Sequence, residues 1–241
     1  MSGHSKWNNI KHKKEKSDAA KAKIFTKIGK EMAVAIKAGG PDPNNNTKLR
    51  DLIQKAKANN VPNENIQRTI KKFTDNSDIN FEEITYEGYG PSGVAIIVET
   101  STDNRNRTAG NVRSWFNKYG GNMGMTGCVS FLFEEKGVIT IIDEDEEIEE
   151  DKIMEDALEC GAEDIKCEEG EYTIYTTPDD LDAVRDAIIS MGYKIETADL
   201  AKVPSTYVTL ENPDDIENME KMLDKFNEDD DVNAVYTNWD N

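Results

Sequence analysis

Apolar residues recur at helical spacing in the first third of the chain. They lie four residues apart at Ile24, Ile28, Met32 and Ile36. This spacing predicts a long amphipathic helix that begins near residue 17 and ends at Gly39. Two shorter stretches of the same kind, residues 49–56 and 66–73, predict a second and a third helix. Three such helices can bury their apolar faces against one another as a small bundle.

The hydrophobic period changes from about 3.6 to about 2 after Asn76. Strands are expected at residues 84–89, 94–100 and 129–134, with a helix at 107–119. Residues 134–203 have the pattern β-α-β-β-α-β, and the segments on either side of them can complete a second unit of similar type. A linear string of three domains has the same pattern, so the pattern leaves both arrangements open.

The predicted fold class is therefore α+β, with an N-terminal three-helix domain followed by two ferredoxin-like α/β sandwich domains. The second sandwich is predicted to be inserted into the first. The domains are expected at residues 1–78, at residues 79–133 plus 204–241, and at residues 134–203.

Charge is divided unevenly between these domains. The chain of 241 residues has a net charge of -19, yet residues 1–78 contain 17 Lys or Arg against 8 Asp or Glu. Residues 134–203 contain 24 acidic and 6 basic residues. Binding to a polyanion depends on a local basic field, so the first domain is the predicted nucleic-acid-binding module. Its first helix carries a basic stripe of Lys23, Lys27 and Lys30 beside the apolar one.

The arm before the first helix combines side chains that suit nucleic acid. Lys6, Lys11, Lys13 and Lys14 can contact phosphates, Trp7 can stack on a base, and His4 and His12 can form hydrogen bonds. A solvated tail, in which Trp7 only packs on the first helix, explains the composition about equally well.

Two further sets of basic residues extend this prediction. Arg68, Lys71 and Lys72 lie on the third predicted helix. Arg105, Arg107 and Arg113 lie at and after the sequence DNRNR, where Asp103 or Asn104 is expected to cap the following helix. Capping and anion binding can coexist at this helix start.

Other classes of site are not indicated. The sequence GYGPSG at residues 88–93 precedes a strand, whereas a dinucleotide site needs a helix there. The two His and three Cys have no metal-ligand spacing, and no local catalytic signature is present. We therefore expect a non-enzymatic protein without a metal or cofactor. The absence of a long apolar run or signal-like segment, together with unpaired cysteines, favours a cytoplasmic protein.

Five segments of the sequence together resemble the YebC/PmpR family. They are the N-terminal arm, VPNENIQRTIKK at 61–72, YEGYGPSGVAIIVE at 86–99, TDNRNRTAGNVR at 102–113 and GGNMGMTGCVSFLFEEKG at 120–137. Members are often labelled probable transcriptional regulatory proteins, and the family includes a mitochondrial translational activator. The resemblance implies a three-domain, non-catalytic protein of the bacterial cytoplasm.

Three hypotheses about the partner remain at this point. The family label favours a DNA-binding transcriptional regulator. The composition of the arm favours RNA, and some members of the family associate with ribosomes and support translation through proline-rich stretches. The third hypothesis is a membrane-surface or protein-docking module that uses the apolar face of the first helix. The sequence does not indicate an oligomeric state.

Overall fold

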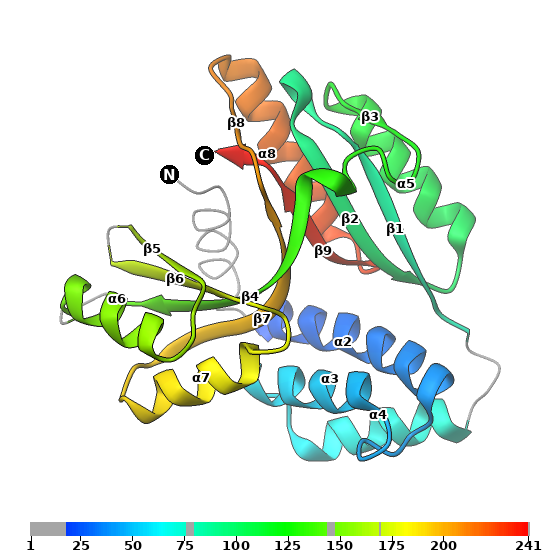
Figure 1. The fold of residues 1–241 in the computed structure, drawn as a ribbon. Coiled ribbons are helices and arrows are strands. Elements are labelled where there is room, and N and C mark those ends of the chain that lie inside the picture. Colours follow the sequence, from blue (N-terminus) through cyan, green and yellow to red (C-terminus); the bar gives the residue numbers. More distant parts are fainter. Residues whose placement is uncertain (1–17, 76–79, 144–147, 169, 241) are drawn as a thin grey trace. The chain divides into compact units, whose positions relative to one another are not determined.

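The computed structural model describes residues 18–75, 80–143, 148–168 and 170–240 (Figure 1). These residues divide into two compact units. The smaller unit contains residues 131–207, and the larger contains the described residues up to 130 together with residues 208–239.

The larger unit begins with three helices, as the apolar spacing predicts. They are α2 (Asp18–Gly39), α3 (Thr47–Ala58) and α4 (Asn63–Asp75). Ile28 and Met32 from α2, Leu49 from α3 and Ile66 from α4 are almost fully buried in one shared core. Asn46 connects the first two helices, since its side chain accepts a hydrogen bond from the Leu49 N–H and donates to the carbonyl oxygens of Ala35 and Gly40.

A four-stranded antiparallel sheet forms the rest of the larger unit, with the strand order β3-β1-β2-β9. Its strands are β1 (Glu82–Tyr89), β2 (Ala95–Thr102), β3 (Asn122–Met123) and β9 (Val232–Thr237). Helices α5 (Arg105–Lys118) and α8 (Pro213–Glu228) pack against this sheet and against each other. Phe116 and Phe226 meet between them with ring centroids 5.3 Å apart. Helix α2 also contacts the sheet, which explains why β2 is buried along nearly its whole length.

Short elements complete this unit. They are the 3-10 turn η1 (Pro91–Gly93), the strand β8 (Val208–Thr209) and the strand β10 (Trp239–Asp240), which pairs with β8. Because β9 comes from the end of the chain and pairs with β2, residues on both sides of the smaller unit build one sheet.

The smaller unit is an antiparallel sheet with the order β5-β6-β4-β7, covered by two helices. Its elements are β4 (Phe133–Ile142), α6 (Glu150–Glu159), β5 (Asp164–Glu168), β6 (Glu171–Thr176), α7 (Leu181–Ser190) and β7 (Ile195–Pro204). This is the β-α-β-β-α-β sequence expected of a ferredoxin-like sandwich. Ile139 and Ile174 from the sheet pack against Ile153 of α6 and Val184 of α7. The predicted fold class is thus confirmed.

The strand predicted at residues 129–134 is wrong. This segment contains a 3-10 turn, η2 (Ser130–Leu132), and only the start of β4. The backbone N–H groups of Val129 and Ser130 donate to the Glu87 carboxylate instead of to a neighbouring strand. The strand that follows α5 is the two-residue β3, which pairs with β1. The predicted boundary at residue 78 stays a prediction, because residues 76–79 lie outside the described residues.

Candidate nucleic-acid interface

The basic stripe on α2 faces the end of α8. Lys27 Nζ donates to the carbonyl oxygen of Asn227 at 3.2 Å, and Lys23 Nζ donates to that of Glu228. Lys30 Nζ donates to the carbonyl oxygen of Asp230 at 2.9 Å. The last carbonyls of a helix have no partner within the helix, and cations near them are favourable. Lys23 and Lys27 therefore cap the C-terminal end of α8, and Lys30 binds the segment just after it.

Lys30 also forms an ion pair with Asp231, with 2.6 Å between Nζ and Oδ1. The Asp231 side chain is only 5% exposed and accepts further hydrogen bonds from Arg107 at 2.6 Å and Thr108 at 2.8 Å. Burial acts to raise the pKa of Asp231, but the bonds from Arg107, Lys30 and Thr108 outweigh it and lower this pKa to about 2. Asp231 is therefore ionised and joins α2 to α5.

Arg107 is committed to this same cluster. Besides Asp231, its guanidinium contacts the Asp103 carboxylate at 2.8 Å, and these two bonds raise its pKa. A cleft of about 420 Å³ lies beside it. Four aspartates and two cations line the cleft, with Phe81 and Asn111 completing the wall. The excess of carboxylates makes this cleft a poor phosphate pocket.

The other predicted basic residues within the described chain are exposed. Arg105 and Arg113 lie on α5, a helix of 14 residues that contains no acidic residue. The side chain of Asn104 caps this helix by accepting a hydrogen bond from the Arg107 N–H at 3.1 Å, so the predicted cap is confirmed.

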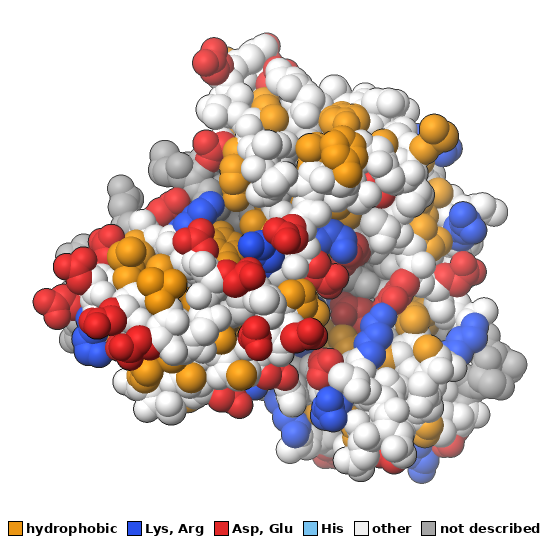
Figure 2. Space-filling view, viewed as in Figure 1, with side chains coloured by type: hydrophobic (Ala, Val, Ile, Leu, Met, Phe, Trp, Pro, Cys, Tyr) orange, Lys and Arg blue, Asp and Glu red, His pale blue; other side chains and the backbone are white. Residues whose placement is uncertain are grey.

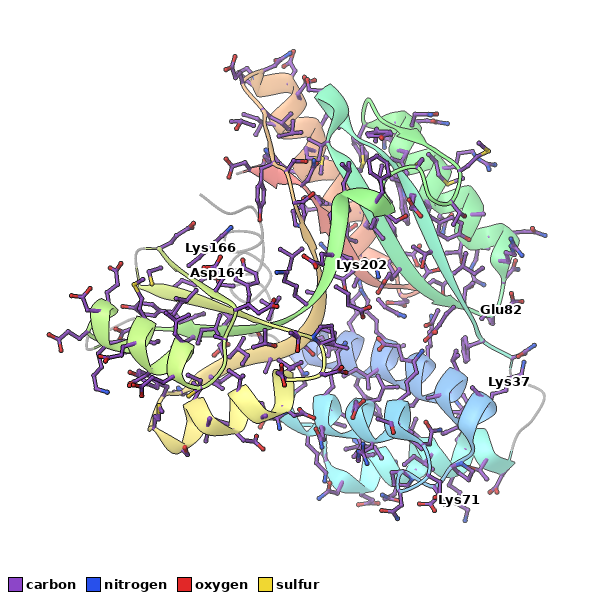
Figure 3. The ribbon with its side chains drawn as sticks, in the orientation of Figure 1. Lys37, Lys71, Glu82, Asp164, Lys166 and Lys202 are labelled. Carbon is purple, nitrogen blue, oxygen red and sulfur yellow. The ribbon has the colours of Figure 1, made fainter. Side chains whose placement is uncertain are left out.

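On α4, Lys71 and Lys72 are exposed, and Lys72 lies over the ring of Phe73. Figure 3 shows Lys71 on the side of α4 that faces away from α2. Arg68 pairs with Glu64 at 2.9 Å, but both side chains are at least 70% exposed. An exposed pair of this kind contributes little stability, and a phosphate can replace the carboxylate.

The predicted residues of the arm lie outside the described residues. They are His4, Lys6, Trp7, Lys11, His12, Lys13 and Lys14. The predicted residues that the structure does describe lie on α2, α4 and α5. Those on α2 form hydrogen bonds within the protein.

Sequence reasoning missed Glu87, which lies within the YEGYG segment of β1. Its buried carboxylate accepts hydrogen bonds from the backbone N–H groups of Gly127, Val129 and Ser130 at 2.7–2.8 Å. Burial acts to raise the pKa of Glu87, but these three donors lower it below its ordinary value. They fix a loop whose tip, Met125, is 85% exposed. The glycines around Glu87 in the sequence indicated a tight turn. They did not indicate that the Glu87 carboxylate holds the loop at residues 127–130.

Fold and surface together define an α+β protein with a basic three-helix segment and an inserted acidic sandwich. Among the charged side chains on the face of the inserted unit that Figure 2 shows, acidic ones prevail over basic ones. Residues 5–76 match the model of the TACO1/YebC protein N-terminal domain, and residues 81–239 match that of the TACO1/YebC second and third domain. The chain belongs to the TACO1/YebC family, which confirms the resemblance seen in its motifs.

Relatives of similar length support this assignment. A protein of Acetivibrio thermocellus is 55% identical over 99% of both chains, and one of Agathobacter rectalis is 55% identical over the full length of both. Both are named "Probable transcriptional regulatory protein". The crystal structure of a conserved hypothetical protein from Aquifex aeolicus superposes with a TM-score of 0.82 at 42% identity. The match covers 92% of this chain and 91% of that one.

Proposed function

We propose that this protein is a non-enzymatic, nucleic-acid-binding regulator of gene expression that acts in the cytoplasm. The exposed basic side of α4 is the observation that carries the proposal. Arg68, Lys71 and Lys72 project from a helix whose opposite side, with Ile66 and Ile70, is buried in the helical core. Their charges are therefore presented to solvent at fixed positions and can contact successive phosphates.

DNA is the first candidate partner, because the relatives are named transcriptional regulatory proteins. Helix α4 exposes Gln67 beside Arg68 and Lys71. These are side chains that can read base edges in the major groove. RNA is the second candidate, because the arm offers Trp7 for stacking and His4 for hydrogen bonding to unpaired bases. On this second reading the protein is a ribosome-associated translation factor.

Binding assays with the full chain test the proposal. The probes are a labelled 20-base-pair DNA duplex and a 20-nucleotide single-stranded RNA, titrated at several salt concentrations. If six basic residues, Arg68, Lys71 and Lys72 among them, each contact a phosphate of the duplex, the slope of log affinity against log salt is about -5. Replacing Arg68, Lys71 and Lys72 together by Ala should make this slope shallower by about 3, since each lost contact contributes about 0.9.

A matched control removes the same amount of charge elsewhere. The triple variant Lys152→Ala, Arg185→Ala and Lys221→Ala removes three basic side chains, each of which is paired with an acid close to it in sequence. We expect its affinity and slope to stay near those of the wild type. Equal effects of the two triple variants would show that only net charge matters and would remove α4 from the interface.

A further inference from the structure

The end of α8 is a polyanionic segment. Glu228, Asp229, Asp230 and Asp231 follow one another at the C-terminal end of the helix. The unpaired carbonyls at this end carry a partial negative charge, so acidic residues are unfavourable there unless cations compensate them. Lys225 compensates Glu228 locally, with 2.6 Å between Nζ and Oε2. Arg107 and Asn111 of α5 contact Asp231 and Asp229. Further compensation comes from a part of the chain about 200 residues away.

That compensation is the basic stripe of α2. Lys23, Lys27 and Lys30 contact the carbonyl oxygens of residues 228, 227 and 230 in turn. Lys30 adds the ion pair with Asp231, and its own side chain is only 15% exposed. We call this set of contacts the α2–α8 latch. In the latch, the ammonium groups of the α2 lysines donate hydrogen bonds to oxygen atoms that are spaced along a polypeptide chain. The phosphate oxygens of a nucleic-acid backbone are acceptors that are likewise spaced along a chain.

We propose that residues 227–231 act as an intramolecular competitor of nucleic acid for the lysine stripe of α2. This inference rests on the proposed function and adds a regulatory step to it. Nucleic acid first contacts the exposed side of α4 while the latch is still closed, and a bound strand of 20 nucleotides or base pairs then extends onto α2. The same lysines cannot donate to α8 and to phosphates at once, so extension of the bound strand onto α2 requires α2 to separate from α8.

The negative charge of the side chains in residues 227–231 sets how strongly this segment competes with nucleic acid for the α2 lysines. The carbonyl oxygen of Asp230 accepts from Lys30, and Asp230→Asn keeps this carbonyl while removing a carboxylate. Weakening the electrostatic attraction should favour the open form and raise affinity for the 20-nucleotide RNA by about 2- to 5-fold at low salt. The control Glu220→Gln removes the same charge from an exposed position in the body of α8. It should raise affinity less.

A distance measurement tests the latch directly. Spin labels are placed at Ala38→Cys on α2 and Glu220→Cys on α8 in the full chain, with Cys128, Cys160 and Cys167 replaced by Ser. Both labelled positions are exposed, and neither is a latch residue. Pulsed electron paramagnetic resonance should give one distance for the free protein and a second, longer distance when saturating RNA or duplex DNA is added.

The outcomes separate the two proposals. Tight binding of either probe with an unchanged distance overturns the latch and leaves the proposed function standing. The latch is also contradicted if Asp230→Asn raises affinity no more than Glu220→Gln. Failure of both probes to bind the unlabelled wild type, measured in parallel, contradicts the proposed function itself.

Discussion

The Asp231 carboxylate accepts hydrogen bonds from Lys30 on α2, Thr102 on β2, and Arg107 and Thr108 on α5. It thereby fixes the junction between the three-helix segment and the sheet of the larger unit. In the sequence it is the last of four consecutive acids, a pattern more typical of a solvated surface. Its cationic partners lie more than 120 residues away, so the local pattern could not reveal them.

Replacing Asp231 by Asn should lower the free energy of unfolding by about 3 kcal/mol, because Lys30 and Arg107 lose their shared counter-ion. Urea unfolding at pH 7 measures this loss. Glu220→Gln, which removes a charge from an exposed site, should stay within about 0.5 kcal/mol of the wild type. Equal stabilities of the two variants would show that Asp231 does not hold the junction.

The pH dependence of stability gives an independent check on Asp231. Its folded-state pKa of about 2 lies below the ordinary value of 3.8. The contribution is therefore present above the ordinary pKa and is lost as the pH falls through about 2, and it amounts to about 2 kcal/mol. Between pH 4 and pH 2 the wild type should lose more stability than Asp231→Asn. Parallel unfolding curves would contradict this assignment.

Glu87 gives a second prediction for a single residue. Glu87→Gln leaves one oxygen to accept three backbone N–H groups and turns an amide donor toward them, which should cost about 1–3 kcal/mol. Thermal and urea unfolding measure the cost. Glu82→Gln on the same strand is the control, since Glu82 is exposed. A variant as stable as this control would show that the loop does not need the carboxylate.

The helices were predicted well from the sequence because each has a sustained apolar period and a clear stop. In the inserted unit, the patterns at residues 149–160 and 179–191 predict helices and that at 172–176 predicts a strand, and these segments form α6, α7 and β6. Strands β4 and β7 are longer than the apolar runs at residues 138–142 and 195–197 that predict them, because charged residues at the start of β4 pair in register with the end of β7, Glu134 with Val203 and Lys136 with Ala201. Pairing with a distant strand, and not local hydrophobicity, extends them.

The junction of α2 and α3 provides a test at the level of elements. Asn46 is buried, accepts one backbone hydrogen bond and donates two. Asn46→Ala should therefore cost about 2–3 kcal/mol, whereas loss of the exposed cap of α8 in Asn212→Ala should cost about 1 kcal/mol. Urea unfolding of both variants measures the difference. Equal costs would contradict a role for Asn46 in joining the two helices.

Charge segregation is the main property of the whole chain. The basic residues of the first 78 residues and the acids of the inserted sandwich coexist in a chain of net charge -19. The sequence predicted this division, and the basic residues that it proposed on α4 and α5 are exposed apart from the pairing of Arg107. It could not predict that the α2 stripe contacts the end of α8, because the spacing of Lys23, Lys27 and Lys30 is the same whether they meet phosphates or carbonyls.

No helix within the described ranges has the length and apolar character needed to span a membrane. The apolar face of α2, which the docking hypothesis would expose, is instead occupied: Ile28 and Ile36 are buried in the helical core. The apolar side of α2 therefore packs in the helical core, and its lysines contact the end of α8 and the residues after it. Among the predicted site residues that the structure describes, those on α4 and α5 are therefore the ones open to a partner.

Ultraviolet crosslinking in living cells tests the central claim most directly. The protein is purified under denaturing conditions, and the DNA and RNA attached to it are both sequenced, for the wild type and for the Arg68, Lys71 and Lys72 triple variant. We predict enrichment of defined nucleic-acid sequences with the wild type and loss of this enrichment with the variant. Promoter DNA would establish the transcriptional role and ribosomal RNA the translational one, while no enrichment over an untagged strain would contradict nucleic-acid binding.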